Sequence, residues 1–159
     1  MRLEEEVGQL LRDCHLKLGV VESASGGLIS HLITNIPGSS DYFEGAIVSY
    51  SNEIKVGLVG VKRDTLEKYG AVSPAVAEEM ARGGLKALDV DICLADTGIA
   101  GPGGATPEKP VGLFYIGLAS GDFISSRRLL LSGDRLQNKE GAARSALEWL
   151  REYLLSYQK

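Results

Sequence analysis

Apolar residues recur along the chain with the spacing of alternating helices and strands. Leu3, Val7 and Leu10 lie on one face at helical spacing, so the chain is expected to open with an amphipathic helix. The closing stretch, 135–157, has the same periodicity and predicts a long helix. Shorter helices are predicted over 26–35, from 51 or 52 to about 58, over 64–69 and from 74 onward, and strands over 17–22, 42–50, 90–96, 111–119 and 123–131.

The last two predicted strands are typical of a hairpin, because only Ser120-Gly121-Asp122 separates them. Elsewhere strands alternate with helices, which favours parallel pairing through crossover connections. We find no internal repeat, low-complexity tract or interdomain linker. The sequence therefore predicts an α/β fold, with residues 1–159 forming a single three-layer α/β/α domain around a mixed, mostly parallel sheet.

Charge and composition exclude several classes of partner. The net charge of -4 argues against sequence-independent nucleic-acid binding, which needs a basic face, although a local positive pocket could still bind a small anion. No apolar run approaches the roughly 18 residues of a membrane span. The acidic start is unlike a signal peptide, and Cys14 and Cys93 lie outside any CxxC pattern. We therefore expect a cytoplasmic protein with neither nucleic acid nor membrane as a partner.

Glycine is the compositional anomaly, with 20 residues, about twice the ordinary share. Two clusters, Gly26-Gly27 and the segment 98–104, follow predicted strands. Ligands of α/β proteins bind at this place, beyond the carboxyl ends of the strands. The two clusters therefore mark the candidate binding region.

The first cluster belongs to the turn Glu22-Ser23-Ala24-Ser25-Gly26-Gly27. A strand that runs through a glycine turn into a helix exposes a serine and directs free backbone N–H groups toward it, which suits a phosphate or an oxyanion. The pattern is neither GxSxG nor a P-loop. A tight turn with serine as a cap and glycine for steric reasons explains it equally well. Ser23 is therefore a candidate nucleophile.

The second cluster opens a long loop, 97–110. Loops of this length in compact domains are usually functional, and Pro107 and Pro110 stiffen this one, so we interpret it as a ligand wall rather than a mobile connection. Asp96, at the end of the preceding strand, is a possible acid or hydrogen-bond acceptor.

Lysine is the more plausible base for a serine nucleophile here. The two histidines, His15 and His31, lie on predicted helices away from the glycine loops, and no metal-binding motif occurs. If residue 51 or 52 caps a helix, Lys55 falls in its first turn, where the helix dipole and burial would both lower its pKa. An ordinary solvated lysine remains the simpler interpretation from the sequence alone. Arg135, near a helix start, could bind phosphate or be a surface charge.

Several motifs, in order, resemble the CinA C-terminal domain family. They are Glu22 to Gly27, the run Pro37-Gly38-Ser39-Ser40, Tyr50-Ser51-Asn52-Glu53-Ile54-Lys55, Gly70-Ala71-Val72-Ser73, the long signature from Thr97 to Gly112, and Gly133-Asp134-Arg135. The resemblance covers nearly the whole chain, and the long signature is very specific. It implies a nicotinamide-nucleotide amidase, which converts nicotinamide mononucleotide to nicotinate mononucleotide and ammonia in pyridine-nucleotide salvage.

The resemblance also implies roles for residues. Ser23 and Lys55 match the catalytic serine and lysine, while Tyr50 and Thr97 match residues expected to position this pair or the amide. No metal or cofactor is implied. The small-molecule nucleotide substrate is expected to contact the glycine segments and Arg135, and the protein is expected to form a homodimer. The expected substrate-binding residues are Ser25, Gly26, Gly27, Gly98, Ala100, Gly101 and Arg135.

The chain departs from the family's usual pattern at two places. Ala24-Ser25 replaces Cys-Thr, and Asp96 replaces an aliphatic residue. If the Asp96 carboxylate faced the pocket, it could repel an anionic substrate. Two alternatives to the nucleotide amidase therefore stay open, namely a non-catalytic nucleotide-binding module and an amidase for another small amide.

Overall fold

The computed structural model describes residues 1–157 and contains one five-stranded sheet, in the order β2-β1-β3-β4-β5. Strands β1, β2 and β3 pair in parallel, β4 runs antiparallel to β3, and β5 runs antiparallel to β4. Four of the five strands thus run in one direction, and the expectation of a mixed, mostly parallel sheet is confirmed. The strands are β1 (Leu18–Glu22), β2 (Phe43–Val48), β3 (Ile92–Gly98), β4 (Leu113–Ser120) and β5 (Phe123–Leu130).

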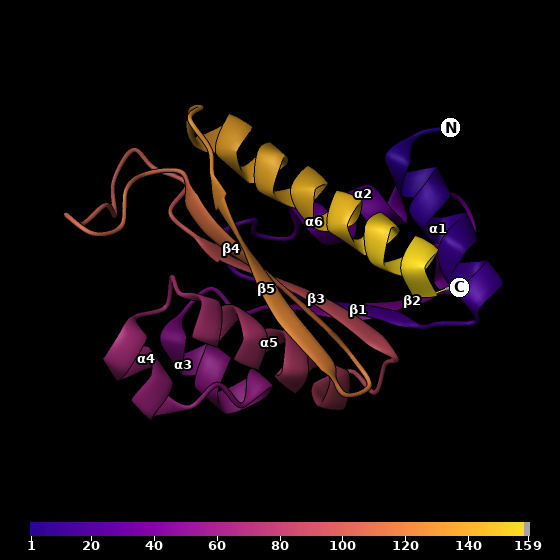
Figure 1. Cartoon of the computed structure of the whole chain (residues 1–159), viewed down its shortest axis with the longest axis horizontal. Coiled ribbons are helices and arrows are strands. Elements are labelled where there is room, and N and C mark those ends of the chain that lie inside the picture. The colour runs from indigo at the N-terminus through magenta and orange to yellow at the C-terminus, as the bar shows by residue number, and fades with distance from the viewer. Residues whose placement is uncertain (158–159) are drawn as a thin grey trace.

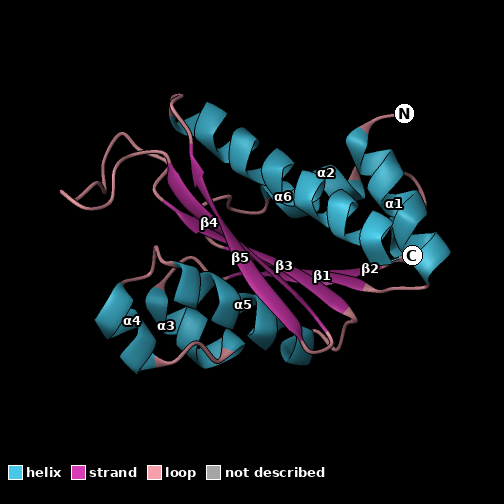
Figure 2. Ribbon diagram, viewed as in Figure 1, coloured by secondary structure: helices cyan, strands magenta, loops and turns pink. Residues whose placement is uncertain are grey.

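Helices cover both faces of the sheet and make the three predicted layers (Figures 1 and 2). One face carries α1 (Leu3–Cys14), α2 (Leu28–Thr34) and α6 (Arg135–Tyr157). The other carries α3 (Asn52–Ile54), the π-helix η2 (Lys55–Val59), α4 (Arg63–Tyr69) and α5 (Pro74–Ala87), and a 3-10 turn, η1 (Ser39–Asp41), precedes β2. Within residues 1–157, no helix is both long and apolar enough to cross a membrane.

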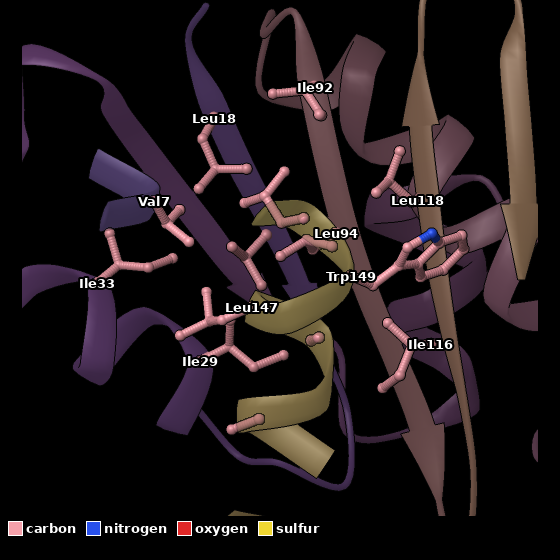
Figure 3. Close-up of a cluster of buried hydrophobic side chains, with 14 of the residues drawn as sticks. Val7, Leu18, Ile29, Ile33, Ile92, Leu94, Ile116, Leu118, Leu147 and Trp149 are labelled. Atoms are coloured by element: carbon pink, nitrogen blue, oxygen red, sulfur yellow. The ribbon is translucent and has the colours of Figure 1, made fainter. Parts of the chain in front are cut away.

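The core has two parts, one on each side of the sheet. Figure 3 shows the larger part, in which Leu18, Leu94 and Ile116 from three strands face Leu147 and Trp149 of α6. The smaller part lies under α5. Side chains alternate between the two faces of a strand, and helices cover both faces of this sheet. The central strands are therefore buried on both faces, which explains their nearly continuous apolar sequence.

The observed elements differ from the predicted ones mainly at their ends. Strand β3 continues to Gly98, because Gly98 still pairs with Phe114 of β4. Helix α2 begins at Leu28 rather than at residue 26, because Gly26 and Gly27 have φ angles of 63° and 105°, which lie outside the right-handed helical region. The closing helix spans 135–157 as predicted.

The parallel strands place the candidate residues at one edge of the sheet. Strands β1, β2 and β3 run in the same direction, so their carboxyl ends meet there. The turn that carries Ser23 follows β1, the segment leading to Lys55 follows β2, and the long glycine loop follows β3. Residues that are far apart in the sequence thereby come together.

Candidate active site

Ser23 and Lys55 form a buried pair at this edge of the sheet. Ser23 is the first residue after β1, and Lys55 opens η2. Lys55 Nζ lies 2.9 Å from Ser23 Oγ, and the two residues are only 1% and 7% exposed, respectively. Two side chains separated by 32 positions are thus in hydrogen-bond contact away from bulk solvent.

The surroundings of the Lys55 amine favour its neutral form. Burial lowers the pKa of Lys55, and the nearby Asp96 carboxylate opposes this effect. Within residues 1–157, Nζ makes two further hydrogen bonds, to the carbonyl oxygens of Ser49 at 2.8 Å and Tyr50 at 3.1 Å. A neutral amine has two N–H groups and one lone pair. In the neutral form the two carbonyls can accept both N–H groups, which leaves the lone pair for the Ser23 hydroxyl.

Local backbone structure places Lys55 there. Ser51 caps the short helix α3 by accepting a hydrogen bond from the Ile54 N–H at 3.2 Å, as the sequence predicted for residue 51 or 52. The chain then widens into the π-helix η2, at whose end the Gly60 N–H donates to Lys55 O. Short π-helical turns occur often at functional sites, and they shift side chains out of the regular α-helical positions.

The buried carboxyl groups of Asp96 and Glu22 accept hydrogen bonds from the backbone of the turn that carries Ser23. The N–H groups of Ser23 and Ser25 each donate to Asp96 at 3.0 Å. Glu22 accepts hydrogen bonds from the N–H groups of Gly27 and Ile29. These four N–H groups are therefore not available to a ligand. The prediction that the backbone N–H groups of the turn point freely toward a ligand is wrong for Ser23, Ser25 and Gly27.

Asp96 lies beneath the turn and away from the cavity. Alternation along β3 puts Asp96 on the face that carries Leu94 and puts Thr97 on the opposite face, toward Ser23 and Lys55. The Asp96 side chain is fully buried, and burial raises its pKa to about 6, against the hydrogen bonds from Ser25 and Ser23. A carboxylate in this position does not face a substrate, so the repulsion considered from the sequence has no basis in the geometry.

A cavity of about 310 Å³ opens over the pair. Ile99, Gly103 and Gly104 of the predicted binding segment 98–104 line it. Four residues that were not predicted to bind a ligand also line it: Ala24, Asn52, Ala71 and Val72. Its lining includes eight of the residues predicted to act on or bind a substrate: Ser23, Tyr50, Lys55, Thr97, Gly98, Ala100, Gly101 and Arg135.

Three predicted residues lie elsewhere. Ser25, Gly26 and Gly27 line a neighbouring cavity of about 340 Å³ between the turn and α6. Because Gly26 and Gly27 have positive φ, their place in the sequence is explained by the turn itself. The sequence pattern could not separate the two sides of the turn.

Polar contacts also fix the rim of the first cavity. Thr97 Oγ1 donates to Ala71 O at 2.8 Å, which ties β3 to the segment before α5. Arg135 donates to Gly101 O at 2.8 Å and to the Tyr50 hydroxyl at 3.3 Å. The Tyr50 side chain is exposed, and it is the Tyr50 carbonyl rather than the phenol that contacts Lys55. Arg135 is therefore a cation at the mouth of the cavity.

Sequence reasoning missed two residues that hold the site. Glu22 ends β1, accepts four hydrogen bonds from the start of α2, and is fully buried. The signal for it was an acidic residue just before a helix start. Asn138 donates to Ala100 O and Gly133 O and so ties α6 to the glycine loop. Nothing in its helical surroundings distinguished Asn138 in the sequence.

Comparisons with known proteins agree on one family. The model of the CinA C-terminal domain matches residues 1–154. A putative competence-damage inducible protein of Caldicellulosiruptor saccharolyticus is 49% identical over 155 residues, which are 98% of this chain and 38% of that protein. One from Moorella thermoacetica is 51% identical over 145 residues, 91% of this chain and 35% of that protein. The chain thus spans less than two-fifths of the length of these curated relatives.

Solved structures match along most of both chains. The competence/damage-inducible protein of Agrobacterium tumefaciens has a TM-score of 0.88 at 35% identity, with 93% of each chain covered. The competence damage-inducible protein A of Klebsiella pneumoniae has a TM-score of 0.93 at 29% identity, with 96% of this chain and 95% of that one covered. Both sequence and structure therefore show that this chain belongs to the CinA C-terminal domain family.

Proposed function

We propose that the protein is a nicotinamide-nucleotide amidase that hydrolyses the carboxamide of nicotinamide mononucleotide to nicotinate mononucleotide and ammonia. The observation that carries the proposal is the buried Ser23–Lys55 pair, with 2.9 Å between Oγ and Nζ. A serine beside a base of lowered pKa is the arrangement that nucleophilic acyl transfer requires. The choice of this amide rests on the motif resemblance to amidases of the CinA C-terminal family.

The first half of the reaction forms an ester. The lone pair of neutral Lys55 takes the proton of the Ser23 hydroxyl while Oγ bonds to the carboxamide carbon, giving a tetrahedral intermediate. When this intermediate collapses, the carbon–nitrogen bond breaks, and the Lys55 ammonium returns its proton to the departing nitrogen. Ammonia leaves, the nicotinoyl group remains on Ser23, and Lys55 is neutral again.

The second half restores the serine. Neutral Lys55 takes a proton from a water molecule whose oxygen bonds to the ester carbon. The bond from that carbon to Ser23 Oγ then breaks, and Lys55 returns the proton to Oγ. The product forms as the carboxylic acid, and nicotinate mononucleotide becomes the carboxylate by releasing the remaining proton to solvent. The complete reaction consumes one water and requires no metal or organic cofactor.

The negative oxygen of each tetrahedral intermediate needs hydrogen-bond donors. Within residues 1–157, the N–H of Ala24 donates to no other residue, and Ala24 lines the cavity directly after the nucleophile. Serine hydrolases of other folds use the N–H of the residue after the nucleophile in the same way. We therefore assign Ala24 N–H as one oxyanion donor. The donors at Ser23 and Ser25 are not available, because Asp96 accepts them.

Arg135 is a cationic side chain at the mouth of the cavity that could bind the phosphate of the substrate. Arg135 lies at the start of α6, and its guanidinium bonds Gly101 O and the Tyr50 hydroxyl across the opening. A guanidinium held in place by two neighbours can bind a phosphate through charge-assisted hydrogen bonds. The cavity of about 310 Å³ is at the lower end of the range of roughly 300–1,000 Å³ for small-molecule sites.

The test is ammonia release from nicotinamide mononucleotide by the wild type and by Ser23→Ala and Lys55→Met. We expect each variant to lose about a thousandfold or more in kcat/KM, as for other paired nucleophiles and bases. Matched controls are Ser145→Ala and Lys86→Met on α6 and α5, which should keep wild-type rates.

Comparable rates in the wild type and both site variants would refute the Ser–Lys mechanism. A wild type that is stabilised by the nucleotide but releases no ammonia would favour a non-catalytic binding module. Turnover of the unphosphorylated riboside at the same kcat/KM as the mononucleotide would instead indicate an amidase for a different small amide.

A further inference from the structure

The Ser25 hydroxyl lies between two buried carboxyl groups. Ser25 Oγ is 2.6 Å from Glu22 Oε1 and also makes a short hydrogen bond with Asp96 Oδ1. Glu22, Ser25 and Asp96 are each at most 1% exposed. The three groups form one connected chain directly beneath the turn that carries Ser23.

Proton counting limits the charge of this chain. A hydroxyl carries one proton and can donate only one hydrogen bond. If Ser25 donates to one carboxylate, its contact with the other is a hydrogen bond only when that second carboxyl is protonated. Two ionised carboxylates on either side of one hydroxyl would leave one buried oxygen facing the Ser25 oxygen without a proton between them, which is costly.

The two carboxyl groups differ in the number of hydrogen-bond donors that can stabilise a negative charge. Glu22 accepts four further hydrogen bonds, from the N–H groups of Gly27, Ile29 and Ser30 and from the Ser30 hydroxyl. Asp96 accepts only two N–H groups, from Ser23 and Ser25. Glu22 therefore has more hydrogen-bond donors to stabilise a negative charge, and we assign the shared proton to the side of Asp96.

We propose that Asp96 is a positioning residue for the Ser23–Lys55 pair, and that it shares one proton with Glu22 through the Ser25 hydroxyl. This inference rests on the proposed amidase function. Asp96 fixes the nucleophile by holding the Ser23 N–H, and it adjusts the base through its charge, since an ionised Asp96 favours the ammonium form of Lys55. It touches no substrate, because it does not line the cavity.

Two titratable groups face Asp96 from the neighbouring elements, Glu22 at the end of β1 and Lys55 at the start of η2. Glu22 raises the pKa of Asp96, whereas the hydrogen bonds from Ser23 and Ser25 lower it. Loss of the Ser25 hydroxyl removes the bridge between the two carboxyl groups and should therefore shift the Asp96 titration. Loss of the Asp96 charge should move the Lys55 titration to lower pH.

The first experiment needs no substrate. Carboxyl carbons of the unliganded protein are followed by ¹³C NMR as pH changes, and the Asp96 resonance is assigned as the one missing from Asp96→Asn. We expect it to titrate with a pKa of about 6 and to shift in Ser25→Ala, while Ser25→Thr, which keeps a hydroxyl, restores the wild-type value. A titration near 3.8, the ordinary pKa of an aspartate, or one that Ser25→Ala leaves in place, would overturn the shared proton.

The second experiment measures kcat and KM against pH for Asp96→Asn and Ser25→Ala. In Asp96→Asn we expect kcat to fall about ten- to a hundredfold with little change in KM, and the acid limb of kcat/KM to move to lower pH. A purely structural role would lower the melting temperature and leave the limb in place, and that result would refute the positioning role. Because the NMR arm does not depend on turnover, an inactive wild type would refute the amidase function without deciding the fate of the shared proton.

Discussion

Replacing Lys55 with methionine tests whether the buried amine is neutral, and it does so without any substrate. Methionine has a similar length and no charge, so it fills the space of a side chain that is only 1% exposed. Burial lowers the pKa of Lys55 in the folded protein, whereas in the unfolded chain its pKa has the ordinary lysine value of 10.5. The folded and unfolded states therefore bind different numbers of protons over part of the pH range.

The sign of the effect follows from this difference. Between the lowered folded pKa and 10.5, the unfolded chain holds one more proton at Lys55 than the folded protein, so the wild type gains stability as pH rises. The gain is at most about 1.4 kcal/mol per pH unit for one proton. Below that interval the full penalty of burying an ammonium is present, and above it the penalty is gone. Lys55→Met removes this dependence.

The replacement also has a cost that does not depend on pH. The carbonyl oxygens of Ser49 and Tyr50 lose their lysine donor, which costs about 1–3 kcal/mol for each oxygen that water does not reach. The unfolding free energy of the variant, relative to that of the wild type, should therefore be highest at low pH and should fall steadily as pH rises toward 10.5.

Urea unfolding of both proteins at several values of pH between 6 and 10 measures this difference, since shared titrations cancel. Lys86→Met, at an exposed position on α5, is the control and should follow the wild type at every pH. A constant difference in unfolding free energy between Lys55→Met and the wild type would refute the reasoning. It would mean that Lys55 titrates alike in the folded and unfolded states and cannot be the neutral base.

Three further predictions concern the cavity and the elements around it. Gly98→Ala would place a Cβ 2.2 Å from the buried Phe114 ring, so we expect a loss of about 1–3 kcal/mol in urea unfolding and a lower kcat as the glycine loop shifts. Arg135→Ala should raise KM for nicotinamide mononucleotide about tenfold in steady-state kinetics and leave the unphosphorylated riboside unaffected; equal effects on both would contradict phosphate binding. Ser73→Ala removes the cap that accepts the Val76 N–H and should cost about 1 kcal/mol in thermal or urea unfolding without changing KM.

Most of the fold could be predicted because local and global signals agree in this chain. The hairpin of β4 and β5, the helix over 135–157 and the helix that starts after Ser73 each combine a periodic apolar pattern with a clear turn or cap. The region after residue 51 was predicted as one short helix and is a short α-helix followed by the π-helix η2. Its apolar pattern is helical in both cases, so the sequence alone could not distinguish them.

The candidate site was predicted as a set of residues but not as a geometry. The elimination of the histidines and the cap before Lys55 made a lysine base plausible, and the structure brings that amine to Ser23. What the sequence could not show is that the carbonyls of Ser49 and Tyr50 accept hydrogen bonds from the Lys55 amine. Backbone carbonyls are present at every position, so no residue type marks those that will face a side chain.

Positions 25 and 96, at which this chain departs from the pattern of the family that it resembles, lie far apart in the sequence. The structure joins them, because the Ser25 hydroxyl and backbone N–H both bond to the Asp96 carboxyl beneath Ser23. A buried carboxyl at the end of β3 would be costly with no donors around it, and the turn supplies them. An aliphatic residue at position 96 would leave the N–H groups of Ser23 and Ser25 without this acceptor. The chemistry of position 96 therefore acts on how the Ser23 turn is held, whereas Thr97, on the opposite face of the sheet, and the glycine loop line the cavity.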